Sequence, residues 1–156
     1  MKRHIIISLL FLSFGLAQKR YNINHIVEHK GIYIKKFSNQ AISGEVFQMF
    51  GNMKVPLGKM KNGKKEGKWI SWYPNGQKKS VLTYKNENID GLFTTWYENG
   101  QKKVERTYKD GEPDGLDRKW YKNGQKRLEE TWKNGEWISV KEWNEDGSLI
   151  RKINRW

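Results

Sequence analysis

The sequence WYPNGQKK at residues 72–79 returns as WYENGQKK at 96–103 and as WYKNGQKR at 120–127, each time 24 residues further along. A unit of this size is one supersecondary element that cannot bury its apolar face alone, so equal neighbours must stack and share a core. An array of equal units favours binding over catalysis, because catalytic groups must converge in a closed pocket.

An Asn-Gly pair stands in the middle of every copy. The three pairs are Asn75-Gly76, Asn99-Gly100 and Asn123-Gly124. Asn-Gly accepts positive φ at both central positions of a type I′ turn, which makes it the strongest short-range signal for a β-hairpin. Each unit is therefore predicted to be one hairpin. A second polar turn, such as residues 110–115, is expected to be longer and less regular and to link one hairpin to the next.

The glycines of the repeat set the expected boundaries. Gly67, Gly91 and Gly115 open three clear units, and Gly44 opens a degenerate one upstream. The predicted fold is all-β, an elongated array of antiparallel β-hairpin repeats. The expected units are 44–66, 67–90, 91–114, 115–136 and 137–156, and residues 18–43 are expected to form an N-terminal capping segment. The last unit lacks the Trp-Tyr pair, as expected of a terminal capping repeat.

The first residues have the composition of an export signal. Lys2 and Arg3 precede an apolar stretch at residues 5–16. The small residues Gly15 and Ala17 occupy positions −3 and −1 of a signal-peptidase cleavage site before Gln18. Residues 1–17 are therefore predicted to be a signal peptide cleaved before Gln18, with an uncleaved N-terminal anchor as the alternative. The protein is expected in the periplasm, in the outer envelope or outside the cell. It has no cysteine, so an exported fold must be stable without the help of disulfides.

Strand alternation divides the side chains of a unit between two faces. The Trp and the Tyr of each Trp-Tyr pair are expected on opposite faces because they are neighbours. Trp72, Trp96 and Trp120 stand at identical unit positions, so we expect them to pack between repeats. A specific partner is expected to contact positions that differ between units. These candidate binding residues are Trp69, Phe93 and Arg118.

The chain is strongly basic, with 30 Lys and Arg against 17 Asp and Glu and a formal net charge of +13. Basic pairs follow each Asn-Gly and are predicted to form one cationic stripe, consisting of Lys78, Lys79, Lys102, Lys103, Lys126 and Arg127. Anionic lipid or acidic polysaccharide would suit such a stripe. Export disfavours nucleic acid as a partner. The alternative interpretation is that these lysines keep an open β array soluble and block edge pairing.

No pattern in the sequence predicts catalysis, a metal or a cofactor. The string His25-Ile26-Val27-Glu28-His29 fits H-x-x-E-H, but zinc hydrolysis also needs a third protein ligand, and no histidine follows His29. No base for a Ser or Cys nucleophile stands within the repeats. The acidic residues of the turns do not form a D-x-D-x-D-G calcium loop.

The repeat unit as a whole resembles the bacterial variant of the MORN repeat, a type found in proteins often labelled as antitoxins. The matching positions of the first unit are Gly67, Trp72, Tyr73, Asn75, Gly76, Tyr84 and Gly91, and the resemblance covers residues 44 to 150. It implies an elongated sheet of hairpins used for protein contacts and, in some members, for binding membrane lipid. It implies no enzyme activity.

These observations together predict a non-enzymatic, exported binding or scaffold module with a protein partner that the sequence does not identify. One alternative is an antitoxin-like protein that neutralises a partner toxin. A second alternative is binding to an anionic membrane surface or polysaccharide.

Overall fold

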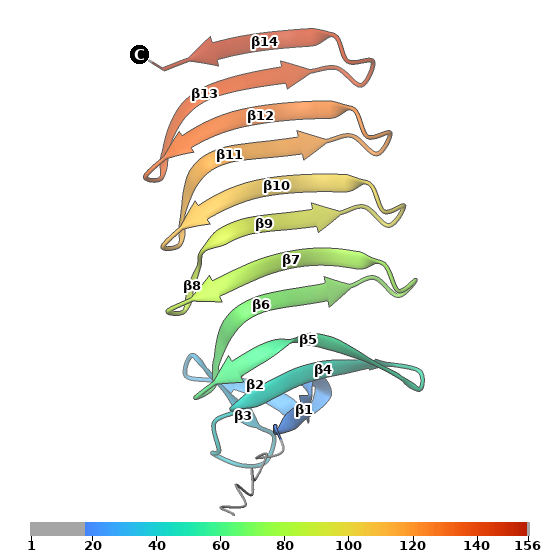
Figure 1. Cartoon of the computed structure of the whole chain (residues 1–156), viewed down its shortest axis with the longest axis vertical. Helices are drawn as coiled ribbons and strands as arrows, with labels where there is room; N and C mark the ends of the chain where they lie inside the picture. Colours follow the sequence, from blue (N-terminus) through green and yellow to red (C-terminus); the bar gives the residue numbers. More distant parts are fainter. Residues whose placement is uncertain (1–17, 156) are drawn as a thin grey trace, which may run out of the picture.

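The computed structural model describes residues 18–155, and these form an all-β protein around one 12-stranded sheet (Figure 1). The strands of this sheet are β1 (Arg20–Asn22), β4 (Gly44–Phe50), β5 (Met53–Lys61), β6 (Lys64–Trp72), β7 (Lys78–Lys85), β8 (Asn88–Ile89), β9 (Gly91–Trp96), β10 (Lys102–Lys109), β11 (Glu112–Trp120), β12 (Lys126–Lys133), β13 (Glu136–Trp143) and β14 (Leu149–Asn154). From β4 to β14 the strands follow one another in chain order as an antiparallel meander, with β8 beside β7. The predicted all-β array of hairpins is confirmed.

The N-terminal part of the described chain adds a second layer at one end of the sheet. Strand β1 pairs in parallel with β4, a single 3-10 turn η1 (Ile23–His25) follows, and β2 (Ile26–His29) and β3 (Ile32–Lys35) form a separate hairpin. Within residues 18–155 no helix is long and apolar enough to cross a membrane. The predicted signal peptide, residues 1–17, lies outside the described residues.

The Asn-Gly turns differ from the predicted type. Gly76 has a φ of +84°, whereas Asn75 is not among the residues with positive φ. The Gly76 N–H donates to the Tyr73 carbonyl at 3.0 Å, and the Tyr73 N–H donates to the Gln77 carbonyl at 2.8 Å. This is a type I turn followed by a glycine in the left-handed region, a common hairpin connection one residue longer than a type I′ turn. The prediction of type I′ geometry at these turns was therefore wrong.

The type I′ geometry occurs instead at the other end of the strands. Positive φ at both central residues is found at Asn62-Gly63, Asn86-Glu87, Asp110-Gly111 and Asn134-Gly135. These turns are two residues long, since Lys109 pairs directly with Glu112. The expectation of a longer linking turn was wrong because the residues after Gly111 belong to β11. The two turn types alternate, and those with Asn-Gly-Gln stack along one side of the sheet (Figure 1).

The sheet has two faces, which we name after neighbouring positions on β9. The Phe93 face carries Phe93 and Thr95, and the Trp96 face carries Thr94 and Trp96, because successive strand residues alternate. In Figure 1 the β2–β3 hairpin lies behind β4 and β5, on the Phe93 face.

The main core lies between this hairpin and the start of the sheet. Its buried members are Ile26, Ile42, Val46, Leu57, Met60 and Trp69. The Trp69 ring lies over Gly58, where an added Cβ would come within 2.6 Å of the indole. A glycine is therefore required at position 58 for the ring to pack. The Trp69 Nε1–H donates to the Lys59 carbonyl at 3.1 Å, which satisfies the one polar atom of the side chain.

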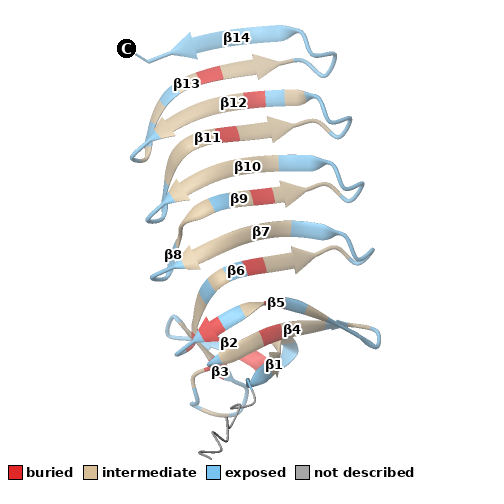
Figure 2. Ribbon diagram, viewed as in Figure 1, coloured by how far each residue is buried: buried red, intermediate tan, exposed pale blue. Residues whose placement is uncertain are grey.

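Beyond β7 the sheet is a single layer among the described residues. Its buried positions are few and lie near the middle of the strands (Figure 2). They are Thr94, Asp117, Leu128 and Val140. Both faces of β9–β14 are therefore open to solvent in this part of the chain.

Candidate functional site

The six basic residues after the Asn-Gly turns separate into two rows on opposite faces. A β-bulge shifts the register between Lys102 and Val104, so the side chains of Lys102 and Lys103 diverge. Lys102 pairs with Trp96 on the Trp96 face, and its Nζ lies 5.7 Å from the centre of the Trp120 ring. The Nζ of Lys103 lies 5.5 Å from the Tyr97 ring on the Phe93 face. The predicted single cationic stripe is therefore divided.

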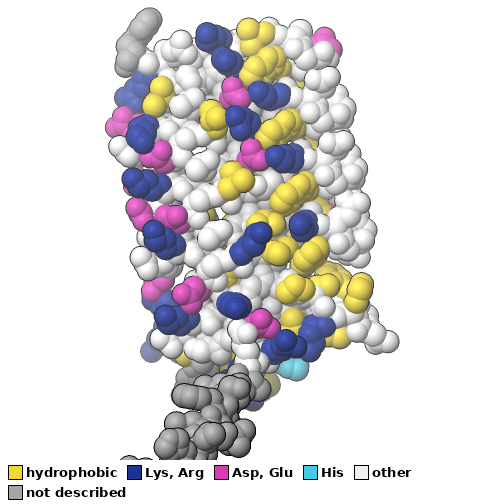
Figure 3. All heavy atoms as spheres, viewed as in Figure 1, with side chains coloured by type: hydrophobic (Ala, Val, Ile, Leu, Met, Phe, Trp, Pro, Cys, Tyr) yellow, Lys and Arg dark blue, Asp and Glu magenta, His cyan; other side chains and the backbone are white. Residues whose placement is uncertain are grey.

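Carboxylates neutralise two lysines of the row on the Trp96 face, Lys102 and Lys126. The Nζ of Lys102 lies 2.6 Å from a Glu105 oxygen, and the Nζ of Lys126 lies 2.9 Å from a Glu129 oxygen and 5.1 Å from the Trp143 ring. Figure 3 shows this face, on which hydrophobic side chains and alternating charges form adjacent columns. Lys78, Lys79 and Arg127 are exposed, and the Lys79 Nζ lies 5.7 Å from the Tyr73 ring.

An ion-pair ladder crosses three strands on the same face. Arg118 of β11 lies between Glu105 of β10 and Glu129 of β12, with N–O distances of 3.3 and 3.2 Å. The hydrogen bond from Lys102 lowers the pKa of Glu105 below its ordinary value, and Arg118 adds to this effect. The hydrogen bond from Lys126, together with Arg118, likewise lowers the pKa of Glu129. Arg118 is thus engaged within the sheet.

The three variable candidates do not form one surface. Trp69 is a core residue with 7% of its surface exposed, so its ring is not available to a partner. Phe93 is half-buried on the Phe93 face, with its ring edge-on to Tyr108 at a centroid distance of 6.4 Å. Arg118 lies on the Trp96 face. Strand alternation separates these residues, because position 118 corresponds to position 94 of the preceding unit and not to position 93.

The repeated tryptophans lie on the Trp96 face and are half-buried. Trp72 packs against the main core, and its Nε1–H donates to the Pro56 carbonyl at 3.0 Å. Trp96 and Trp120 lie outside that core cluster. Trp120 has the Nζ of Lys102, from the preceding hairpin, at 5.7 Å from the centre of its ring, and packing of Trp96 and Trp120 between repeats stays a prediction.

A buried ion pair lies at the centre of the Phe93 face. Asp117 has no exposed surface, and its Oδ2 accepts hydrogen bonds from Nε of Arg106 at 2.8 Å and from Nη2 of the same guanidinium. Its Oδ1 has no hydrogen-bond partner among the described residues. A signal for this pair exists in the sequence. Asp117 occupies the unit position of Trp69 and Phe93, and Arg106 occupies the position of Leu82, so two apolar positions changed to opposite charges together.

The rest of the open Phe93 face is aromatic and aliphatic. Tyr108 pairs with Gly91 and Trp132 pairs with Gly115, so each ring stands opposite a glycine on the neighbouring strand. Leu128 and Val140 are buried in the same area. The face therefore combines aromatic rings, a charged centre and small apolar patches.

Side chains of the Asn-Gly turns form a ladder from one hairpin to the next. The hydroxyl groups of Tyr73, Tyr97 and Tyr121 donate to the carbonyls of Trp96, Trp120 and Trp143, at 2.8 to 2.9 Å. The side-chain amides of Asn75, Asn99 and Asn123 donate to the carbonyls of Glu98, Lys122 and Glu145, at 3.0 to 3.1 Å. The repeated Tyr and Asn are therefore structural. Sequence reasoning assigned the Asn to the turn and missed its contact with the next unit.

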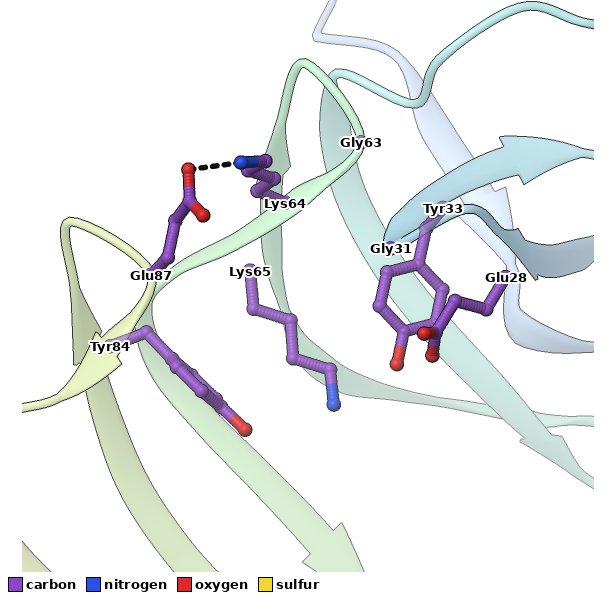
Figure 4. Close-up of a pocket in the computed structure, with 8 residues that line it drawn as sticks. All are labelled: Glu28, Gly31, Tyr33, Gly63, Lys64, Lys65, Tyr84 and Glu87. Carbon is purple, nitrogen blue, oxygen red and sulfur yellow. Dashed lines mark hydrogen bonds and ion pairs between the residues drawn. The ribbon is translucent and has the colours of Figure 1, made fainter. Parts of the chain in front are cut away.

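One cavity of about 270 Å³ lies where the β2–β3 hairpin meets the sheet (Figure 4). Lys65 extends into it, and its Nζ lies 5.4 Å from the Tyr33 ring, 5.1 Å from the Trp69 ring and 5.5 Å from the Tyr84 ring. Burial raises the pKa of Tyr33, as does its hydrogen bond to Glu28, and burial raises the pKa of Tyr84. The Lys65 ammonium thus contacts one ring of the hairpin, Tyr33, and two rings of the sheet, Trp69 and Tyr84. These contacts link the hairpin to the sheet.

The H-x-x-E-H string lies on two short elements. His25 ends the 3-10 turn η1 and His29 ends strand β2. Among residues 18–155 no group of three or more His, Cys, Asp and Glu side chains is placed to hold a metal ion.

Comparison with known proteins identifies the repeat. The MORN repeat variant matches three segments, residues 65–86, 89–110 and 113–134. No curated protein and no solved structure matches the chain. The matched segments cover β6 to β12, which contain the two complete turn-to-turn steps of the ladder. Residues 65–134 are therefore a run of three MORN repeat variants, and they form the centre of a β-sheet repeat module.

Proposed function

We propose that the chain is a non-enzymatic binding module that takes a protein partner on the Phe93 face of β9–β14. The observation that carries this proposal is that the chain itself covers only one half of that face. At β4–β7 the chain's own β2–β3 hairpin packs on it through Ile26 and Tyr33, whereas at β9–β14 no described element does (Figure 1). A protein partner would continue the layer that the hairpin begins.

The chemistry of the open part supports a protein over other partners. Its rings belong to Phe93, Tyr108 and Trp132, and its central cation is Arg106. Aromatic residues and Arg are the types enriched in protein interfaces, while Lys is depleted there. The antitoxin hypothesis is a special case in which this partner is a toxin. The anionic-surface hypothesis is weakened, because Glu105 and Glu129 neutralise Lys102 and Lys126.

Export before binding is part of the proposal and rests on the N-terminal sequence. Mass spectrometry of the N-terminus in separated cytoplasmic and exported fractions tests it. An exported chain that begins at Gln18 supports it, and a cytoplasmic chain that keeps Met1 contradicts it.

The docking face is tested by photo-crosslinking in the native host. A photoreactive residue replaces Val104, which is half-buried on the Phe93 face, and in a matched control it replaces Thr107, on the other face of the same strand. We expect one discrete protein adduct from position 104 and none from position 107. Equal adducts from both positions, or none from position 104, contradict the proposal.

The partner found in this way is then purified and titrated against two charge reversals. Lys119→Glu changes the Phe93 face and Lys141→Glu changes the Trp96 face, and both side chains are half-buried. We expect Lys119→Glu to weaken binding at least tenfold and Lys141→Glu to leave it unchanged. The reverse order would assign the partner to the other face.

A further inference from the structure

The sheet ends at a strand with one free edge. Within residues 18–155, strand β14 pairs only with β13, and all of its residues are exposed (Figure 2). Three of them are large and apolar, with exposed fractions of 56% for Leu149, 50% for Ile150 and 43% for Ile153. An exposed apolar edge strand presents unpaired backbone groups that can accept another strand.

The direction of the free backbone groups follows from one contact with β13. The Arg155 N–H donates to the Ile138 carbonyl at 2.6 Å, so this residue turns its backbone groups toward β13. In an antiparallel pair, alternate residues turn their groups to alternate sides. The N–H and C=O groups of Lys152 and Asn154 therefore point away from the sheet.

The last turn is not built to hold a further repeat. Where the other units have the Tyr and the Asn of the ladder, this turn has Asn144 and Asp146. The Asn144 amide donates to the Ser148 hydroxyl at 2.9 Å, and Asp146 accepts the Ser148 N–H at 2.8 Å. A carboxylate has no N–H to donate to a following hairpin. The edge thus suits a single strand better than another hairpin of the same kind.

The charges beside the edge indicate the composition of that strand. On the Trp96 face the cross-strand series runs Glu105, Arg118, Glu129, Lys141 and Lys152. Its alternation of sign breaks at the last step, where Lys141 and Lys152 are directly opposite each other. Opposite charges stabilise a cross-strand pair and like charges destabilise it. An acidic residue opposite Lys152 would restore the alternation.

The other face gives the neighbouring positions. Ile153 pairs with Val140, so an apolar residue suits the position opposite Ile153. Arg151 pairs with Glu142 at 2.7 Å and offers its other side to a second acidic residue. Two copies of β14 paired antiparallel would place these basic residues against each other, which disfavours self-association.

We propose that β14 is a docking edge for an extended acidic segment of another protein. The segment adds as an antiparallel strand, with residues of the order apolar, acidic, acidic, apolar opposite Ile153, Lys152, Arg151 and Ile150. Backbone hydrogen bonds hold the strand, and the two acidic side chains select it. This edge is separate from the Phe93 face, and its test does not depend on that proposal.

The test measures binding of a fluorescent peptide to the full chain by anisotropy. The peptide has the sequence Ser-Thr-Val-Glu-Glu-Val-Thr-Ser, and its control has Lys in place of both Glu. Lys152→Glu reverses the selecting charge, and we expect about tenfold weaker binding of the Glu peptide and a preference for the Lys peptide. Asn154→Pro removes one outward N–H, and we expect about fivefold weaker binding, while the matched Asn154→Ala keeps the affinity.

Amide exchange of β13 verifies that β14 stays paired in Asn154→Pro, since the lost N–H points away from β13. Lys119→Glu on the Phe93 face is expected to bind the Glu peptide with unchanged affinity. The proposal is overturned by a lack of saturable binding to the unmodified chain, or by binding that Asn154→Pro does not weaken. It is also overturned if sedimentation shows a dimer that Lys152→Glu dissociates, because the occupant would then be a second copy.

Discussion

Asp117 is the residue at which this sheet departs most from its own repeat. The same position holds Trp69 and Phe93 in the preceding units, and burial of a carboxylate there requires Arg106 beside it. A buried ion pair contributes little net stability, because desolvation of both charges offsets their attraction. Removal of one partner is costly, because the other charge remains buried without compensation.

The first prediction concerns this pair. Arg106→Leu is expected to lower the free energy of unfolding by about 3 kcal/mol, because Asp117 loses the guanidinium that donates both of its hydrogen bonds and keeps only Lys119, at 3.9 Å. The double variant Arg106→Leu, Asp117→Phe restores the apolar pattern of the earlier units and is expected to return to within about 1 kcal/mol of the original stability. Urea unfolding of both single variants and the double variant measures the coupling. Additive losses would show that the two side chains do not act as a pair.

The second prediction concerns acid stability. The pKa values of Glu105 and Glu129 are lowered in the folded state, so both carboxylates bind fewer protons there than in the unfolded chain. Their stabilisation is present above the unfolded pKa of about 4.3 and is lost as the pH falls through the lower folded values.

Arg118→Met removes a cation that both carboxylates share. We expect it to lower stability at pH 7 by about 1 kcal/mol and to make the loss of stability between pH 6 and pH 3 smaller than in the unmodified chain. Thermal unfolding across this pH range measures both effects. Lys122→Met, at an exposed lysine of a nearby turn, serves as the control. A parallel pH profile for Arg118→Met and the unmodified chain would contradict the assigned role of the ladder.

At the scale of the element, the Asn-Gly turn does two jobs with one side chain. The Asn123 Oδ1 accepts the Gln125 N–H at 2.9 Å and shapes its own turn, while Nδ2 donates to the Glu145 carbonyl of the next hairpin at 3.1 Å. Turn formation and stacking of units are thereby coupled. This coupling explains why the repeat keeps Asn where Asp would also form a turn.

The third prediction separates the two roles. Asn123→Asp keeps the acceptor and loses the donor, so we expect it to lower stability by about 1 kcal/mol, the net value of one hydrogen bond. Asn123→Ala loses both contacts and is expected to lose about 2 kcal/mol. Tyr121→Phe removes only the hydroxyl that donates to Trp143 and should match Asn123→Asp. Equilibrium unfolding tests this order, and an Asn123→Asp variant as stable as the unmodified chain would assign no weight to the ladder.

At the scale of the whole molecule, stability is distributed unevenly along the array. The β2–β3 hairpin and β4–β7 enclose the main core, whereas β9–β14 form a single layer in the described chain. In a linear array each unit contacts only its neighbours, so local opening can occur without unfolding of the rest. The open half is also the part that the proposed function uses.

The fourth prediction follows from this distribution. Hydrogen exchange is expected to be slowest in β4–β6 and to become faster toward β14, where every residue is exposed. Trp69→Ala removes a buried indole and is expected to destabilise the covered half by about 4 kcal/mol. Mass spectrometry of exchanged peptides reads both halves separately. Uniform acceleration of exchange over all strands in Trp69→Ala would show one cooperative unit instead.

The amino-acid sequence by itself determined the class of the fold. The recurrence of Trp-Tyr and Asn-Gly every 24 residues requires equal hairpins, and strand alternation places the Trp and the Tyr of a pair on opposite faces. These properties are local, since they depend on residues a few positions apart. They also carry the resemblance to the MORN repeat variant, which the family comparison confirmed at residues 65–134.

The tertiary structure decided which of these residues can meet a partner. The bulge at Lys103 divides the basic stripe, which was predicted as a single row. Gly58 leaves room for the Trp69 ring in the core, although Trp69 was predicted to contact a partner. The type of each turn was likewise set by the register of its strands. The β2–β3 hairpin covers one half of a face and leaves the other half open. Register and covering depend on contacts between segments far apart in the chain, and local sequence patterns do not contain them.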